Sequence, residues 1–162
     1  MIAGSLASSA HGIPRSTHDI DIVIDPTFAS LEHLLKLLAT KDRYVDPDKA
    51  RAEFLRRGQF NVIDMTTGWK ADLIFRKARP FSRSEIDRSS EQEILGVHVL
   101  AASAEDTILS KLEWAAKSGE SERQLRDVRG ILDTQGDALD FAYIEQWLDE
   151  LGVRELWDRV RS

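Results

Sequence analysis

Cysteine is absent from the 162 residues, so disulfide bonds and thiolate metal ligands are excluded. The sequence also lacks an apolar run near the ~20 residues that cross a bilayer, and its start shows no signal-peptide pattern. The four histidines have no zinc-ligand spacing and are interpreted as structural residues. These absences predict a cytoplasmic protein with no membrane partner.

Basic residues are fewer than acidic ones, with 22 Lys and Arg against 28 Asp and Glu. The resulting net charge of −6 argues against indiscriminate binding to nucleic acid but is compatible with a local basic patch. The apolar fraction of 42% and the charged fraction of 31% are ordinary for a soluble globular protein. At this length we expect one compact unit, or two small units that pack together.

The chain changes character near residue 102. Before this point, β-branched runs such as 20–24 alternate with amphipathic helical segments, which is typical of an α/β (α+β) arrangement. From Ser103 onward, start signals and glycine breaks predict helices over 104–118, 122–134, 140–150 and 153–161. We therefore expect a core with a sheet and flanking helices over 1–102 and a helical bundle over 103–162.

Start and stop signals place the elements of the first part. Asp25-Pro26 and Asp46-Pro47 each indicate a helix N-cap followed by proline at the first helical position. The segment 94–100 is expected to be one extended stretch bent at Gly96. The other expected elements are a helix over 6–11, a helix that ends near Lys41, strands over 20–24, 60–65 and 70–75, of which the last two form a hairpin, and a turn or short helix over 84–89.

Two aspartates on one strand face are the strongest chemical signal. Because strand side chains alternate, Asp19 and Asp21 project to the same side. Two neighbouring carboxylates repel each other unless a cation lies between them, and oxygen ligands favour a hard ion such as magnesium. A spacer of thirteen residues separates Asp19 from Gly4-Ser5, which lies at the N-terminus of a helix whose amides attract phosphate oxygens. The pattern predicts a site for a nucleoside triphosphate and its metal ions.

This arrangement resembles the signature of the DNA polymerase beta-like nucleotidyltransferase superfamily. That signature joins an apolar residue, Gly and Ser to alternating acidic and apolar residues, and then to a third acid on a later strand. Asp72, between Ala71 and Leu73, fits the third position. Arg15-Ser16-Thr17, shortly before the aspartate pair, is similar to the abortive-infection type of bacterial nucleotidyltransferase, known as toxins of type IV toxin–antitoxin pairs.

The resemblance implies a mixed sheet of the nucleotidyltransferase fold and transfer of an NMP group from an NTP to a hydroxyl acceptor, for a toxin an RNA. It implies Mg²⁺ bound by Asp19, Asp21 and Asp72, with two ions when NTP is present, and a partner protein from an adjacent gene. In the same reading Gly4, Ser5, Arg15 and Lys111 bind the nucleotide. Members of this type carry an acidic residue and a lysine on a downstream helix, and the similar residues here are Glu105, Asp106, Lys111, Arg123 and Arg126-Asp127.

Several of these residues have simpler structural interpretations. Asp64 competes with Asp72 for the third position, because a three-residue hairpin loop would place both on one face and a loop of two or four would separate them. Lys70 is a natural ion-pair partner for an exposed Asp72. Asp25 shares the face of Asp21 but is expected to cap the next helix.

Arg15 and the candidate residues of the helical half could likewise have a structural role instead of a role in the site. Arg15 could be a surface loop residue, and Lys111 a core lysine whose ammonium reaches solvent. Asp127 is expected to form a helix-surface ion pair with Arg123, four residues away. The tryptophans on helical apolar stripes are expected in the core rather than against a base: Trp114, Trp147 and Trp157.

Two functions from different classes remain open at this point. The first is an active nucleotidyltransferase, and the second is a catalytically weak or inactive binding module, similar to an antitoxin, that uses its helical half. A typical member has a helix and a full strand before Gly-Ser, whereas three residues precede Gly4 here. We therefore expect a truncated first strand, through a misplaced start or an edge that another chain covers. The sequence selects neither the nucleotide nor the acceptor, and it leaves a homo-oligomer open.

Overall fold

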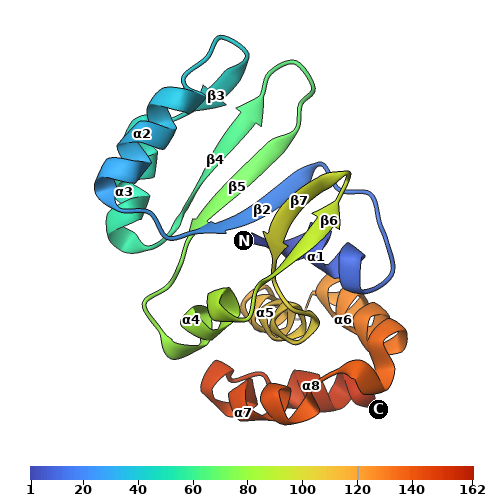
Figure 1. Cartoon of the computed structure of the whole chain (residues 1–162). Coiled ribbons are helices and arrows are strands. Elements are labelled where there is room, and N and C mark those ends of the chain that lie inside the picture. The colour runs from blue at the N-terminus through green and yellow to red at the C-terminus, as the bar shows by residue number, and fades with distance from the viewer. Residues whose placement is uncertain (120) are drawn as a thin grey trace.

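The computed structural model describes residues 1–119 and 121–162 (Figure 1). The strands are β1 (Ile2–Ala3), β2 (Asp19–Ile24), β3 (Arg43–Val45), β4 (Gln59–Asp64), β5 (Lys70–Phe75), β6 (Ser90–Ile94) and β7 (Val97–Ala101). The α-helices are α1 (Gly4–His11), α2 (Phe28–Leu38), α3 (Pro47–Arg56), α4 (Pro80–Asp87), α5 (Ala104–Lys117), α6 (Glu122–Gln135), α7 (Phe141–Leu151) and α8 (Arg154–Arg161), and a short 3-10 helix, η1 (Gly136–Ala138), follows α6. None of the helices in these residues combines the length and apolar character that a membrane crossing needs.

The strands form one mixed sheet in the order β3-β4-β5-β2-β1-β7-β6. β2 is parallel to β5 and antiparallel to β1, while β1 is parallel to β7. β4 and β5 form the expected antiparallel hairpin. The expected mixed α/β fold with a helical second half is therefore confirmed.

One face of the sheet packs on α2 and α3, which Figure 1 shows beside β3 and β4. Because strand side chains alternate, β4 and β5 direct every second residue into this layer. The buried residues of this sheet core are Leu31, Leu35, Ala50, Phe60, Val62, Leu73 and Phe75. The opposite face of β2 and β5 is left for the polar residues that concern the site.

The helices of the second half have their own hydrophobic core, to which α4 contributes Phe81. Trp147 and Trp157 are buried there as expected. α1 contacts both α5 and α6, and it also contacts β2. The α1 end of this junction is fixed by polar contacts, since His11 Nε2 lies 2.7 Å from the Ala102 carbonyl and Gln135 Nε2 donates to the His11 carbonyl at 2.7 Å.

The expected cap of α2 is wrong. The N-cap is Thr27, whose hydroxyl accepts a hydrogen bond from the Ser30 amide at 3.2 Å. Asp25 lies at the end of β2 and instead binds Arg57 at 2.7 Å and Arg76 at 2.8 Å. Two guanidinium groups outcompete backbone amides for this carboxylate, and the next residue with a capping side chain starts the helix. Asp46 caps α3 as expected.

The expected single stretch over 94–100 is also wrong, because β6 and β7 form an antiparallel hairpin. Ile94 pairs with Val97, so Leu95 and Gly96 alone make the turn. Both have positive φ, 53° and 76°, as a two-residue type I′ turn requires. Leucine is unusual at such a position, which hides the turn from sequence patterns. β3 was not expected either, since a three-residue strand carries little periodic signal.

Candidate active site

The parallel register of β2 and β5 brings the predicted acids together on one face. Asp21 lies next to Asp72, and Asp19 lies next to Lys70. The Lys70 ammonium is 3.0 Å from Asp72 Oδ2 and 3.5 Å from Asp19 Oδ1. Asp72 is largely buried, whereas the Asp19 side chain is half exposed. The face is therefore a strip of three carboxylates with one lysine among them.

Asp64 lies on the opposite face of the sheet. The residue paired with Asp72 on β4 is Asn61, so the odd-even alternation places Asp64 on the other side. Its Oδ1 accepts hydrogen bonds from the amides of Thr66 and Thr67, both at 2.9 Å. These amides lower the pKa of Asp64. Asp64 is a turn residue, and Asp72 is the acid that shares a face with Asp21.

The Gly4-Ser5 turn touches Asp21 directly. Gly4 begins α1 with φ of +60°, and a Cβ added to it would lie 1.8 Å from Asp21 Oδ2. Only glycine permits both the backbone conformation and this approach. Burial and the neighbouring Asp72 carboxylate raise the pKa of Asp21, while a hydrogen bond from the Ser5 amide opposes that rise. The first turn of α1 and the acidic strip thus form one continuous surface.

A network of cations adjoins this surface. Asp127 on α6 binds Lys111 Nζ at 2.7 Å and Arg15 Nε at 3.2 Å. Arg15 also donates to the Ser5 hydroxyl, and Lys111 donates to Gln124 Oε1 at 3.0 Å. Arg15 and Lys111, which are 96 positions apart in the sequence, therefore share one carboxylate beside the Gly4-Ser5 turn.

This network corrects the expectation for Asp127. The carboxylate does not pair with Arg123 on the helix surface, because it points inward to Lys111 and Arg15. Lys111 is only 3% exposed, so its ammonium does not reach solvent. Sequence reasoning missed the role of Gln124, whose only signal is its spacing of three residues from Asp127 on one helix face.

Burial sets the electrostatics of the network. Burial lowers the pKa of Lys111, and Asp127 opposes that shift. Burial alone would raise the pKa of Asp127, but hydrogen bonds and charge from Lys111, followed by those from Arg15, hold it below its ordinary value. The contacts with Lys111 and Arg15 therefore favour the ionised form of Asp127, and this carboxylate in turn favours the charged form of Lys111.

One pocket of about 380 Å³ between the sheet and the helical half is lined by the three acids Asp19, Asp21 and Asp72 and by Lys111. Trp114 also lines it, with 55% of its surface exposed. The expectation that Trp114 belongs to the core is therefore wrong. Periodicity places a residue on a helix face but does not tell a core from the wall of a pocket. The remaining basic lining residues are Arg76, Lys77, Arg79 and Arg123.

The acidic strip suits a divalent cation in its chemistry, because carboxylate oxygens are the ligands that Mg²⁺ prefers. Burial, and after it the Asp72 carboxylate, raise the pKa of Asp21, and a cation bound at the strip would offset both effects. Within residues 1–119 and 121–162, however, no group of three or more His, Asp or Glu is already gathered around one point. Asp19 is held by Lys70 instead.

The mixed α/β fold is that of a nucleotidyltransferase, and its Gly-Ser turn and strand carboxylates meet in one pocket. The chain belongs to the family of the nucleotidyl transferase AbiEii toxin of type IV toxin–antitoxin systems, whose family model matches residues 4–155. Membership implies a nucleotide substrate and an antitoxin partner.

Solved structures support the fold. The solution structure of the antibiotic-resistance factor ANT(2'')-Ia is similar to this chain with a TM-score of 0.58 and 18% sequence identity. The match covers 98% of this chain and 86% of that chain. No curated protein sequence matches the chain significantly.

Proposed function

We propose that this protein is a magnesium-dependent enzyme that transfers an NMP group from an NTP to a hydroxyl group of RNA. The observation that carries the proposal is the contact between Gly4 and Asp21, with Asp72 beside Asp21 in the parallel register. The Gly4-Ser5 turn and this pair of carboxylates line the same pocket, which is large enough for a small ligand, and this supports a role for the turn in binding phosphate.

The turn and the cations would hold the triphosphate. The N-terminus of α1 offers amides and a positive helix dipole to phosphate oxygens. Arg15 donates to the Ser5 hydroxyl, so that hydroxyl is free to donate its own proton to a phosphate. Lys111 adds a buried positive charge, and Asp127 holds both cations in place. These groups favour a polyanionic leaving group over a neutral one.

Asp19, Asp21 and Asp72 would hold the metal. Mg²⁺ bound there would neutralise phosphate charge and stabilise the attacking and leaving oxygens. Asp72 accepts the proton of the acceptor hydroxyl, whose oxygen attacks the α-phosphorus while the bond to the β-phosphate breaks and pyrophosphate leaves. In this proposal 1–102 is the catalytic core and 103–162 supplies Lys111 and Asp127.

The arginines of α6 support RNA as the acceptor. Arg123 lines the pocket, and Arg126 and Arg129 follow at intervals of three residues, all three exposed. Successive residues at this spacing form a stripe along one side of a helix. A basic stripe that leads away from the pocket, on a chain with a net charge of −6, suits the backbone of a polyanion.

The test compares Asp21→Asn and Asp72→Asn with the matched variant Asp64→Asn on the other face. We would measure NTP binding with Mg²⁺ by titration calorimetry, and the transfer of labelled NMP to total RNA. Loss of the carboxylates should lower turnover by roughly a hundredfold or more, since the metal supplies several kcal/mol. Asp64→Asn should keep the activity, because asparagine can still accept the turn hydrogen bonds. Equal turnover in all three variants would remove the proposal.

A further inference from the structure

One stripe of α5 faces the pocket with residues that the proposed phosphate site does not use. Thr107, Ser110, Lys111 and Trp114 all line the pocket, at the helical spacing i, i+3, i+4 and i+7. Lys111 belongs to the cation network described above. Ser110 and Trp114 are neighbours on adjacent turns, with about 5–6 Å between Cβ atoms at such spacing. An exposed indole and a hydroxyl group therefore stand side by side on the pocket wall.

Glu85 of α4 meets this stripe. Ser110 Oγ donates a hydrogen bond to Glu85 Oε1 at 2.5 Å, and Glu85 also lines the pocket. The nearby Arg79 guanidinium is already bound to Glu113 at 2.6 and 2.7 Å and to Ser82 at 3.1 Å. Burial raises the pKa of Glu85 to about 7. Glu85 thus has a hydroxyl partner, but its neighbouring cation is engaged elsewhere.

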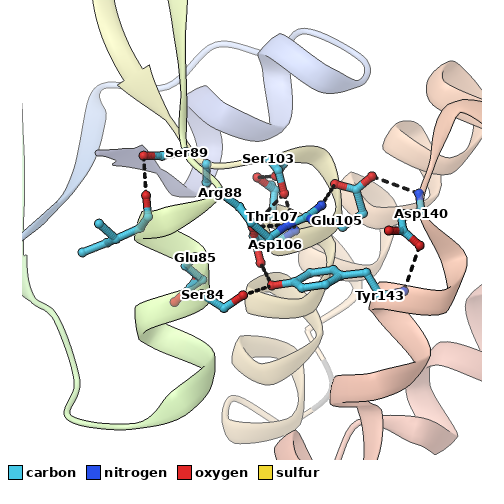
Figure 2. A network of polar contacts seen from close by, with 12 residues as sticks. Ser84, Glu85, Arg88, Ser89, Ser103, Glu105, Asp106, Thr107, Asp140 and Tyr143 are labelled. Carbon is cyan, nitrogen blue, oxygen red and sulfur yellow. Dashed lines mark hydrogen bonds and ion pairs between the residues drawn. The ribbon is translucent and has the colours of Figure 1, made fainter.

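The wall that carries Glu85 is fixed in position. Figure 2 shows that Tyr143 of α7 reaches α4 and α5 together. Its hydroxyl donates to Asp106 Oδ1 at 2.6 Å and lies 2.8 Å from Ser84 Oγ. The Arg88 guanidinium stacks 3.8 Å from the centre of the Tyr143 ring. α4 therefore holds Glu85 on a rigid support against α5, as a recognition group needs.

We propose that Trp114, Ser110 and Glu85 form a nucleobase subsite, in which the indole stacks on the base and the Glu85–Ser110 pair hydrogen-bonds its edge. The inference rests on the proposed function, since it names what the other end of the same pocket binds. A base offers an apolar π-face and an edge of donors and acceptors, and the wall offers an exposed ring and a polar pair one helical turn away. A phosphate would find no free cation at Glu85, because the Arg79 guanidinium is bound to Glu113 and Ser82.

A base could reach the subsite from the NTP or from the acceptor RNA. The experiment measures the binding of each of the four NTPs with Mg²⁺, of tripolyphosphate with Mg²⁺, and of a single-stranded 12-nucleotide RNA, to the intact chain. The variants are Trp114→Ala and Glu85→Gln. Tyr44→Ala is the matched control, because Tyr44 is an aromatic residue with 53% exposure on β3, outside the pocket.

For an NTP base, Trp114→Ala should weaken NTP binding roughly tenfold, the scale of one stacking contact, and leave tripolyphosphate binding unchanged. Glu85→Gln should change the order of affinity among the four NTPs, because a carboxyl and an amide present different donors to a base edge. If both variants weaken RNA binding and spare every NTP, the base belongs to the acceptor and the subsite stands.

The inference is overturned if the two variants bind every NTP and the RNA as Tyr44→Ala does. Failure of the proposed function would look different. In that case the wild-type chain would bind neither tripolyphosphate nor any NTP, and the subsite would fall with the nucleotide site. Retained tripolyphosphate binding, together with no effect of either variant, removes the base subsite alone.

Discussion

Lys111 on α5 and Asp127 on α6 form an ion pair of 2.7 Å that is almost fully buried. The same carboxylate binds Arg15, which lies between α1 and β2 and reaches the Ser5 hydroxyl. The pair therefore links the packing of two helices to the position of the Gly4-Ser5 turn. In the proposed function, stability and phosphate binding would depend on the same three charged side chains.

Asp127→Asn should destabilise the protein strongly. It leaves Lys111 buried without a counter-charge, and the loss of one partner of such a pair costs about 3–5 kcal/mol. Urea unfolding measures the change in the free energy of unfolding. Asp133→Asn, at an exposed position of the same helix, is the control and should change little. The double variant Asp127→Asn/Lys111→Met should recover part of the lost free energy of unfolding. A loss below about 1 kcal/mol in Asp127→Asn alone would contradict a buried charge pair.

Gly4→Ala should abolish NTP binding as well as reduce stability. The Cβ of the alanine would lie 1.8 Å from Asp21 Oδ2, and the alanine backbone would have to adopt a φ of +60°. Gly68→Ala separates the two effects, because Gly68 has a φ of +77° with open space around it. That control should lose only about 1 kcal/mol of stability and keep NTP affinity. Equal NTP affinity in Gly4→Ala and Gly68→Ala would show that the turn does not position Asp21.

Glu85 should make stability depend on pH. Its pKa of about 7 lies above the ordinary value of 4.5, so the folded state favours the protonated acid. The stabilisation is complete below about pH 4.5 and is lost as the pH rises to about 7. Relative to Glu85→Gln, whose amide stays neutral, the wild type should lose roughly 3 kcal/mol across this window. Urea unfolding at pH 4.5, 6 and 8 measures the difference, and a constant difference would contradict a buried carboxyl.

Lys70→Met should strengthen binding of Mg²⁺ in the absence of nucleotide. The ammonium now neutralises Asp72 and Asp19 at 3.0 and 3.5 Å, and it competes with a cation for both. Loss of one unit charge at this distance changes affinity about fivefold when solvent screens it. Calorimetric titration with Mg²⁺ measures the change, with the exposed Lys49→Met as control. Weaker binding in Lys70→Met would show that the lysine supports the metal site.

Sequence periodicity predicted that Asp19 and Asp21 lie on one face of the sheet, because the alternation of side chains along a strand depends only on local backbone geometry. Asp21 and Asp72 share a face for the same reason that Leu73 faces the core. A helix cap was predicted correctly at Asp46, whose carboxylate accepts hydrogen bonds from the backbone amides of Asp48 and Lys49. The cap at Asp25 was wrong because Arg57 and Arg76, distant in sequence, bind that carboxylate.

Two of the residues that sequence reasoning placed wrongly, Asp127 and Trp114, depend on distant contacts. Asp127 looked like a surface residue because its partners, Lys111 and Arg15, come from two other elements. Trp114 lies on an apolar helical stripe, yet the neighbouring layer is a pocket rather than a core. Helical spacing fixes the direction of a side chain, and only the packed fold decides what it meets.

The odd-numbered residues of β2, among them Asp19 and Asp21, lie on the face of the sheet that carries Asp72. The even-numbered residues lie on the other face. A slip of β2 by a single position against β5 would therefore bury Asp19 and Asp21 among apolar side chains and turn the isoleucines toward the pocket. Such a misfolded chain would lose its sheet core and its acidic strip in the same event. A compact but inactive form with the wrong strand alignment should for that reason be too unstable to accumulate.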